Sequence, residues 1–592
     1  MTSDTSSNNY SGIEEEKKKN NIHTTKSNVI VTNVSEQLRT VVSRRGDRRI
    51  QVVTSANQQI ALEELGYKQE LLRKYTWYEM FGVCFSIMGL MPSIGSTSYQ
   101  AFSSGASSAT WGWLAGSCGI LTMGIALAEI GSSFPTASAI YLATWNWSPP
   151  KYRNLISYAV GFTDTVSLSA SVCSITSGCA SQIYSCVQLY NPDFVVTNGN
   201  TYGLFAGLII FVGIFGCMST SINAKIQNLS SITNIFLLLL VFIALPIATH
   251  KNGVPFNDAK FIFTNVERAD TNWPSGWYWL INSFQPAVWT IGAFDAAIHM
   301  QEEAIPKERI EGRPILLDPA ASPASFGIVS SITACGILGW LMMILLCACM
   351  GPSILDVINT DYDQSITQIF MYSMGKKWTV ALMSLMAWSS LLMAQSCLLS
   401  TSRQFWAMAR DYGIPTKTGS EFFAKVWKNQ PINAMIGSAT LSLLLGLMMF
   451  GGDACSAALF SLSICGMYMA IIVPIILRLT YARKDFNPGT FYLGKFWSPF
   501  ISWCAVIFMS WMIFIVCVPL TYGDQLDQTS MNYTVVIGPG FTLLAMIHYQ
   551  LYQYKFYRGP HSNLSDEEFL ELMGEEGIDQ IVSNHEEYEK KK

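Results

Sequence analysis

Ionisable side chains are rare in the long apolar stretches of this sequence, and the few that occur there are candidates for chemistry. They are Glu129, Asp164, Asp295 and His299. A charge held in a lipid-like environment is costly, and such residues usually lie on a path for a solute or a proton. Asp295 directly follows an interruption of its apolar stretch, so we expect it to meet a substrate amine or to bind and release a proton.

The other ionisable candidates are interpreted as coupling or gating residues, with a structural role as the alternative. Asp164 has threonine neighbours on both sides, so local hydrogen bonding competes with coupling. Glu129 precedes a Gly-Ser-Ser-Phe-Pro segment, which favours a structural or gating role over substrate contact. His299, Glu302 and Glu303 lie at the predicted inner end of one stretch, where the pattern predicts either an interfacial charge cluster or an inner gate.

Two apolar stretches are interrupted near their centres. The first contains Pro92 and Gly95, and the second contains Pro286 and Gly292. Proline removes a helical hydrogen-bond donor, and freed backbone groups are costly in lipid unless they line a cavity or bind something. The breaks lie five stretches apart, which is typical of an inverted repeat with a substrate site at its centre. The alternative is a pair of proline kinks with no ligand role.

The chemistry of these breaks suits a small zwitterion. The amino ends of half-helices favour a carboxylate, and their carboxyl ends present carbonyls to an ammonium group. Trp289 offers an aromatic face to an alkylammonium group, or a gate. The predicted substrate-binding residues are Ser93, Ile94, Gly95, Ser96, Thr97, Trp289, Thr290, Gly292, Phe294 and Asp295.

These residues must be positioned by membrane helices. About twelve apolar stretches recur, each near the roughly 20 residues that cross a bilayer. They cover residues 78–101, 109–132, 154–187, 202–220, 228–249, 277–300, 324–350, 377–402, 432–450, 454–478, 498–520 and 532–553. The sequence therefore predicts an all-α polytopic membrane protein embedded in a lipid bilayer.

The charges of the connecting segments predict the orientation. Three predicted outer loops, 188–201, 451–453 and 521–531, contain no lysine or arginine, whereas most basic residues fall in the predicted inner segments. This bias follows the positive-inside rule and places both termini in the cytoplasm.

Four regions follow from this organisation. We expect a disordered cytoplasmic tail over 1–74, a transport core of ten helices over 75–480, two peripheral helices over 481–554 and a second cytoplasmic tail over 555–592.

Composition excludes several other classes. Charged residues make up 13% of the chain and the net charge is −4, so nucleic acid is not an expected partner. The 14 cysteines sit mostly in apolar runs without metal spacing, and we expect no metal and no cofactor. The sequence has no P-loop, GxSxG or HExxH motif, so neither an enzyme nor a transport ATPase is expected. Transport would then use a gradient, most simply of protons, or exchange.

Several segments resemble the fungal branch of the amino acid–polyamine–organocation superfamily that contains GABA, choline and polyamine permeases. They are 64–70, 85–94, 256–263, 286–292, 531–540 and 559–565. The resemblance implies a LeuT-like fold with a 5+5 inverted repeat and proton-driven uptake of GABA, related ω-amino acids or putrescine. It also implies an acidic residue near a gating tryptophan in the sixth helix, which Asp295 and Trp289 fit.

Departures from the branch leave alternatives open. The family's Pro-Thr-Ala-Gly-Gly stretch reads Pro-Thr-Ala-Ser-Ala over 135–139, and Thr176 stands where relatives carry an acidic residue. A polyamine or choline carrier on the same fold, or a nutrient sensor that binds solute without carrying it, are the competing functions. The plasma membrane is the expected location, with the vacuolar and Golgi membranes as alternatives.

Overall fold

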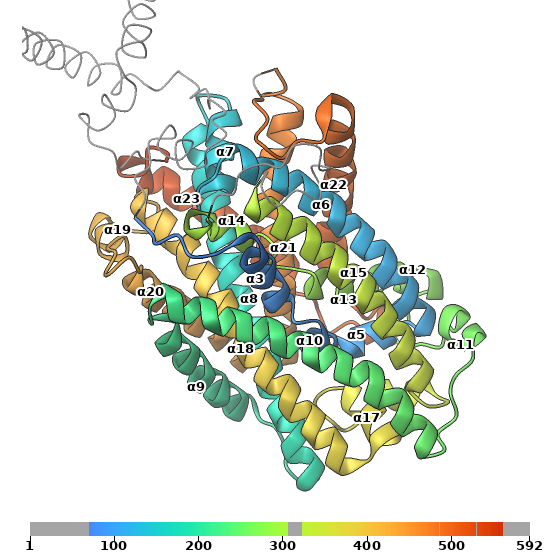
Figure 1. The fold of residues 1–592 in the computed structure, drawn as a ribbon. Helices are drawn as coiled ribbons and strands as arrows, with labels where there is room; N and C mark the ends of the chain where they lie inside the picture. The colour runs from blue at the N-terminus through green and yellow to red at the C-terminus, as the bar shows by residue number, and fades with distance from the viewer. Residues whose placement is uncertain (1–69, 306–321, 485, 528–529, 561–592) are drawn as a thin grey trace, which may run out of the picture. The chain divides into compact units, whose positions relative to one another are not determined.

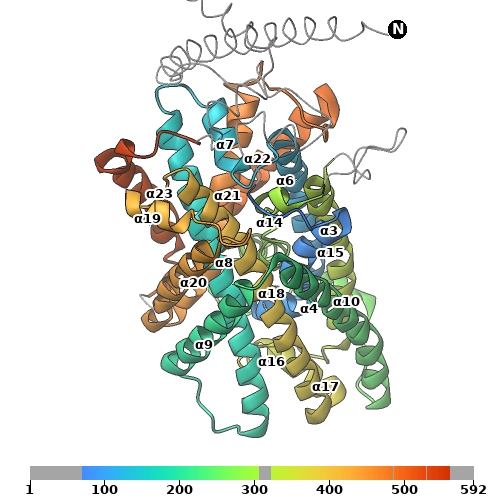
Figure 2. The ribbon, with the colours of Figure 1, turned by 60° about the vertical axis from the view of Figure 1, so that its left-hand side comes forward.

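The computed structural model describes residues 70–305, 322–484, 486–527 and 530–560. The predicted tails therefore lie outside the described residues, apart from 70–74 and 555–560. Within the described ranges the chain is helical, with two isolated β-bridges and no strand. Figures 1 and 2 show long helices running side by side, with α7 (Ala139–Trp147) at one end of the bundle and α16 (Ile354–Ile358) and α17 (Ile366–Met374) at the other.

The first five predicted spans each coincide with helices. They are α3 (Trp77–Met88), α4 (Leu90–Ser96) and α5 (Ser98–Phe102) for the first; η2 (Ser108–Gly112) and α6 (Trp113–Ser133) for the second; then α8 (Arg153–Tyr190), α9 (Asn198–Gly216) and α10 (Thr220–Lys251).

The remaining predicted spans do the same. They are α12 (Ser275–Asn282), α13 (Gln285–Thr290) and α14 (Ala296–His299), which together form the sixth, followed by α15 (Pro323–Cys349), α18 (Lys376–Arg410), α20 (Ile432–Gly446), α21 (Asp453–Leu479), α22 (Gly494–Val516) and α23 (Thr534–Leu551). The connecting segments add α11 (Ala259–Thr264), η3 (Gln301–Glu303) and α19 (Lys417–Phe423).

Ten of the spans in the described chain are long and apolar enough to cross a membrane, against the twelve or so predicted. The sixth falls short because it is broken into three pieces. The third, α8, has 38 residues but many serines and threonines, because it packs along α18 and α21 inside the bundle rather than against lipid. On α9, by contrast, Ile210, Phe211 and Ile214 are exposed, as lipid-facing side chains are.

The break in the first span lies at one residue, Gly89. Its φ of 37° is left-handed, and a Cβ there would stand 2.0 Å from Sδ of Met393, so only glycine fits. Pro92 lies in the first turn of α4, where a missing N–H costs little. Sequence analysis attributed the interruption to Pro92 and Gly95, but both residues lie within the helix α4 and the chain opens before it, at Gly89.

The break in the sixth span is longer. Pro286 is again in the first turn of its helix, α13, which ends at Thr290. Residues 291–295 are not helical, and Ala293 has a φ of 54°. The two broken spans are the first and the sixth, as an inverted repeat of five helices requires.

Candidate functional site

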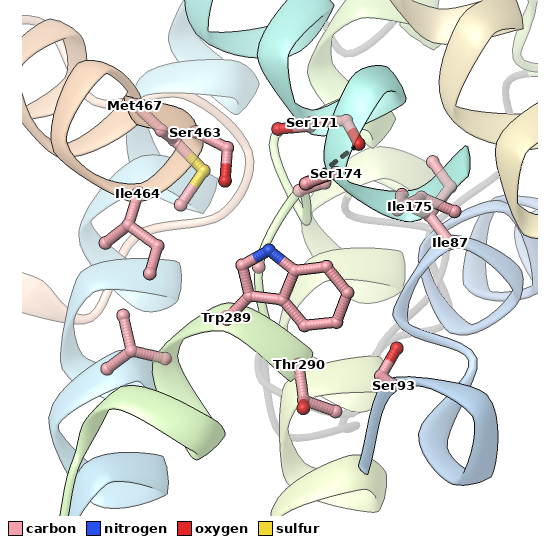
Figure 3. Close-up of a pocket in the computed structure, with 13 residues that line it drawn as sticks. Ile87, Ser93, Ser171, Ser174, Ile175, Trp289, Thr290, Ser463, Ile464 and Met467 are labelled. Carbon is pink, nitrogen blue, oxygen red and sulfur yellow. Dashed lines mark hydrogen bonds between the residues drawn. The ribbon is translucent and has the colours of Figure 1, made fainter. Parts of the chain in front are cut away.

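A small cavity lies between the two breaks. It is bounded by α3, α4, α8, α13 and α21, and its volume of about 30 Å³ holds about two water molecules. The lining residues are Ile87, Ser93, Ser171, Ser174, Ile175, Val288, Trp289, Thr290, Gly292, Ala293, Ser463, Ile464 and Met467 (Figure 3). The predicted substrate residues among them are Ser93, Trp289, Thr290 and Gly292.

Hydroxyl groups dominate the polar lining, which contains no charged side chain. Ser93 donates to the carbonyl of Met88 at 2.7 Å, which has no helical donor because residue 92 is a proline without an N–H. Thr290 differs, because its Oγ1 is buried and has no hydrogen-bond partner in the described chain. A buried hydroxyl without a partner is costly, so Thr290 is a polar group that a ligand would satisfy.

Backbone groups in the second break are also free. Within the described residues the carbonyls of 290–292 accept no hydrogen bond and the amides of 293–295 donate none. Gly292 and Ala293 line the cavity, so these dipoles adjoin it. Carbonyls at the end of α13 favour a cation, and amides at the start of α14 favour an anion.

Trp289 is the largest side chain of the cavity. Its indole lies in the middle of the lining residues (Figure 3) and packs against Phe460 of α21, with ring centroids 5.2 Å apart. An aromatic face in this position can contact an alkylammonium group or close the cavity.

The other predicted substrate residues do not line this cavity. Ser96 and Thr97 donate to the carbonyls of Pro92 and Ser93 on their own helix, because α4 is regular there. Gly95 faces Met386, and Ile94 and Phe294 are buried elsewhere in the core.

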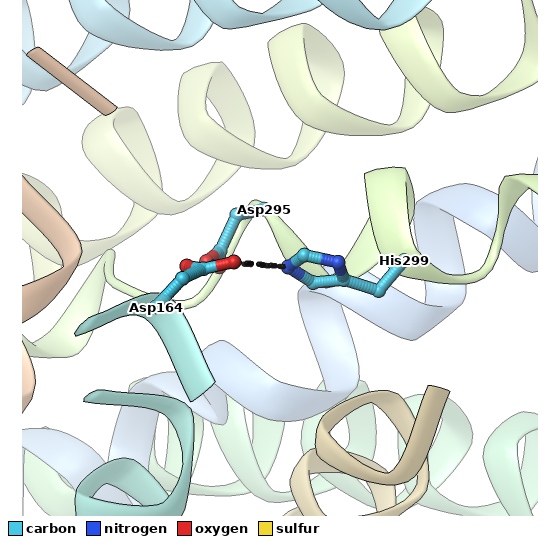
Figure 4. Close-up of side chains that lie close together, drawn as sticks. All are labelled: Asp164, Asp295 and His299. Carbon is cyan, nitrogen blue, oxygen red and sulfur yellow. Dashed lines mark ion pairs between the residues drawn. The ribbon is translucent and has the colours of Figure 1, made fainter. Parts of the chain in front are cut away.

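Asp295 lies instead in a buried cluster with Asp164 and His299 (Figure 4). Nε2 of His299 is 3.5 Å from Oδ2 of Asp164 and 3.8 Å from Oδ2 of Asp295. Asp164 comes from α8, and the other two lie at the start and end of α14. The structure thus brings together three ionisable residues that sequence analysis treated separately.

Glu129 has a complete set of partners. It pairs with Arg478 of α21 at 2.6 Å, and it accepts hydrogen bonds from Ser498 of α22 and from the amide of Leu493. The carboxylate therefore ties α6 to α21 and α22, which favours a structural role.

Glu302 and Glu303 are both buried and paired at the end of the bundle where α7 lies. Glu302 accepts from the Thr136 hydroxyl at 2.7 Å and the Ala137 amide at 2.9 Å, and its side chain is 3.4 Å from Arg410. Glu303 pairs with Arg403 at 2.7 Å. These contacts join the sixth span to α18 and to the segment before α7.

Sequence analysis missed the half of the cavity that α8 and α21 provide. Ser171 and Ser174 stand in a serine-rich stretch of α8, which was a usable signal because serines of a spanning helix gather where it faces other helices rather than lipid. Ser463, Ile464 and Met467 look like ordinary packing residues of α21, and nothing local marks them.

Comparison with known proteins gives a consistent result. The family model described as amino acid permease matches residues 78–541. The GABA-specific permease of Saccharomyces cerevisiae is 40% identical over 93% of this chain and 95% of its own length. A candidate polyamine transporter of Candida albicans is 30% identical over 86% of this chain and 89% of its own. An uncharacterized amino-acid permease of Schizosaccharomyces pombe is 28% identical over 84% of this chain and 88% of its own.

These matches confirm the resemblance that the sequence motifs indicated. They agree with a bundle of membrane-spanning helices whose first and sixth spans are broken around a cavity. The chain is a transporter rather than an enzyme, and it belongs to the amino acid permease family.

Proposed function

We propose that the chain is a proton-coupled carrier of GABA or related ω-amino acids, with its substrate-binding site in the cavity between the two helix breaks. The observation that carries the proposal is the pairing of an uncharged, hydroxyl-lined cavity with free backbone groups of both signs beside it. The similarity to a GABA-specific permease supports the substrate class.

The two ends of the substrate use different groups. The ammonium group contacts the carbonyls of 290–292 and the face of Trp289, since both favour a cation. The carboxylate accepts from the Thr290 hydroxyl and from free amides of 293–295, since those donors have no other partner in the described chain. The three methylene groups of GABA, which separate its charged ends, then lie against the apolar side chains of Ile87 and Ile175.

The cavity must widen before it admits such a molecule, because its present volume suits about two waters. Movement of the Trp289 ring away from Phe460 would create that space without breaking a hydrogen bond that the described residues make. Trp289 is therefore proposed as a gate as well as a contact.

The proposed orientation places the α7 end of the bundle in the cytoplasm. It rests on the excess of lysine and arginine in the segments at that end. The plasma membrane is the proposed location, and fluorescence of a tagged full-length chain distinguishes it from the vacuolar and Golgi membranes.

A polyamine carrier is the second candidate, because the relative from Candida albicans is named for that substrate class. A diamine carries two ammonium groups and no carboxylate. Such a ligand would need acidic side chains around it, and none of the described lining residues is acidic. The cavity therefore favours an amino acid.

The test is uptake of labelled GABA by yeast that lacks its own GABA carriers. We expect saturable uptake that rises as the medium is acidified, and inhibition by unlabelled GABA at lower concentration than by putrescine or choline. An empty vector and the Trp289→Ala variant, matched for surface abundance, are the controls. Absence of GABA uptake, or stronger inhibition by putrescine, would refute the assignment.

A further inference from the structure

Three ionisable side chains meet at one buried point near the proposed substrate-binding site. Asp164, Asp295 and His299 are each 0% exposed. Nε2 of the imidazole is 3.5 Å from a carboxylate oxygen of Asp164 and 3.8 Å from one of Asp295. Figure 4 shows the imidazole ring pointing toward the two carboxylates. This group, the Asp164–Asp295–His299 cluster, joins α8 to α14.

The contacts of His299 fix where protons must lie. Its Nδ1 is 3.0 Å from the carbonyl oxygen of Ala137, and a carbonyl can only accept, so Nδ1 carries a hydrogen. Nε2 then meets two acceptor groups. At least one proton must lie between Nε2 and a carboxylate, because a bare lone pair facing two carboxylates is repulsive.

Charge balance calls for a second proton. Neither carboxylate has another hydrogen-bond partner in the described chain. With His299 protonated, two ionised aspartates would leave a net negative charge that is buried and unsolvated, which is strongly unfavourable. One protonated aspartate, one ionised aspartate and one imidazolium give a neutral cluster.

Groups on the neighbouring helices do not supply the missing positive charge. Cys84 of α3 and Cys397 of α18 lie close enough to Asp295 to interact with it electrostatically, but a thiol carries no positive charge. Arg410 of α18 cannot supply that charge, because it already pairs with Glu302 farther along the sixth span. Within the described residues no lysine or arginine forms an ion pair with Asp164 or Asp295.

The cluster is mechanically linked to the cavity through two elements. Asp295 follows by two residues the cavity residue Ala293, whose φ is 54°. Asp164 and the cavity residue Ser171 lie on the same helix, α8, two turns or about 10 Å apart at 1.5 Å per residue. A shift of the break when substrate binds therefore changes the distance between the carboxylates of Asp295 and Asp164. The proton affinity of the pair changes with that distance.

We propose that the Asp164–Asp295–His299 cluster is the proton-binding unit that couples solute movement to the proton gradient. This inference rests on the proposed function and identifies the proton site within it. One proton from water on the outer side binds an aspartate oxygen and later leaves to cytoplasmic water, and no other bond is made or broken. Because the substrate is a net-neutral zwitterion, one positive charge crosses with each molecule carried.

A metal cation is the competing occupant. One ligand atom from each residue lies within 4.8 Å of the others. Hard cations in proteins take about six oxygen ligands, and this cluster offers only two carboxylates and one nitrogen. The proton therefore fits the cluster better, and dependence on Na⁺ is a distinguishable outcome of the test.

The experiment uses the full chain in proteoliposomes, with labelled GABA as the probe and with Asp164→Asn and Asp295→Asn as variants. Two measurements are compared: accumulation driven by an imposed proton gradient, and counterflow, in which labelled GABA exchanges for internal unlabelled GABA without a gradient. We expect each variant to lose accumulation by about tenfold, within the usual range of coupling energies, and to lose its pH dependence while counterflow persists. Persisting counterflow also shows that the variant is folded and binds GABA.

Glu79→Gln is the matched control, because it removes a carboxylate near the start of α3 while a glutamine can still complete the capping box there. It should keep both accumulation and pH dependence. If the two aspartate variants keep gradient-driven accumulation, or if wild-type accumulation follows Na⁺ rather than protons, the proton cluster is refuted while GABA transport stands. If wild-type protein shows no counterflow of GABA, the proposed function itself fails.

Discussion

Nε of Arg403 lies 2.7 Å from Oε1 of Glu303, and both side chains are buried. The pair joins α18 to η3 at the end of the sixth span. The carbonyl of Glu303 also accepts the amides of Lys74 and Tyr75, which lie just before α3. Glu303 therefore holds together three segments that lie far apart in the sequence: α18, η3 and the residues just before α3. They meet on the side proposed to be cytoplasmic.

Breaking this ion pair from one side should be more damaging than replacing both partners. Arg403→Met leaves a buried, unpaired carboxylate, and it is expected to cost about 3–5 kcal/mol of stability. Adding Glu303→Leu removes the orphaned charge and should recover part of that loss. Thermal unfolding of the detergent-solubilised protein, followed by tryptophan fluorescence, measures both.

The double variant is also informative about gating. If the pair closes the side proposed to be cytoplasmic, the double variant should unfold at a higher temperature than Arg403→Met yet still carry GABA poorly. A double variant less stable than Arg403→Met alone would contradict the role of the carboxylate as the orphaned charge.

Gly89 should tolerate no side chain. A methyl group there would meet the side chain of Met393 at 2.0 Å, and the left-handed φ of 37° adds strain of about 1 kcal/mol or more. We expect Gly89→Ala to abolish uptake, because the residue shapes the break beside the cavity. Gly207→Ala on α9 is the control, since its added methyl meets no atom within 4 Å, and it should keep wild-type uptake. Normal transport by Gly89→Ala would show that the break is not needed.

The helices were predictable from the sequence because their signal is local. A run of apolar residues of membrane-spanning length needs no knowledge of neighbours. The interruption of the first stretch was attributed to Pro92 and Gly95, whereas proline is accepted in the first turn of a helix and the residue with left-handed backbone is Gly89.

The cavity was only half predictable. Trp289 and Thr290 stand beside a visible proline and glycine, whereas Met467 and Ile464 reach the cavity only through the packing of α21. The Asp164–Asp295–His299 cluster illustrates the same limit. Each member was notable as an ionisable residue in an apolar stretch, but spacing along the chain cannot reveal that Asp164 and His299 approach to 3.5 Å.

Thr290 should affect substrate affinity more than stability. Its buried hydroxyl has no partner in the described chain, so Thr290→Val removes an unsatisfied group and should leave the melting temperature unchanged or raised. If the hydroxyl donates to the substrate carboxylate, KM for GABA should rise about tenfold, as for a lost hydrogen bond to a charged group of roughly 1.5 kcal/mol.

Thr249→Val is the matched control for that experiment. Thr249 is also a buried threonine, but its hydroxyl donates to the carbonyl of Leu245 within α10, away from the cavity. It should leave KM unchanged. Equal KM values for wild type and Thr290→Val would remove the Thr290 hydroxyl from substrate recognition.

The segment after α23 is expected to contribute to folding although sequence analysis assigned 555–592 to a tail. Tyr557 is 0% exposed, its hydroxyl lies 2.8 Å from that of Ser157, and its ring packs edge-on against Tyr158. Tyr557→Ala should therefore cost about 3–5 kcal/mol, and Tyr557→Phe only about 1 kcal/mol for the hydrogen bond. Tyr554→Ala, which truncates a side chain that is 51% exposed, should change little. Melting temperature and surface abundance report the order, and a Tyr557→Ala protein as stable as Tyr554→Ala would show that the segment does not anchor the start of α8.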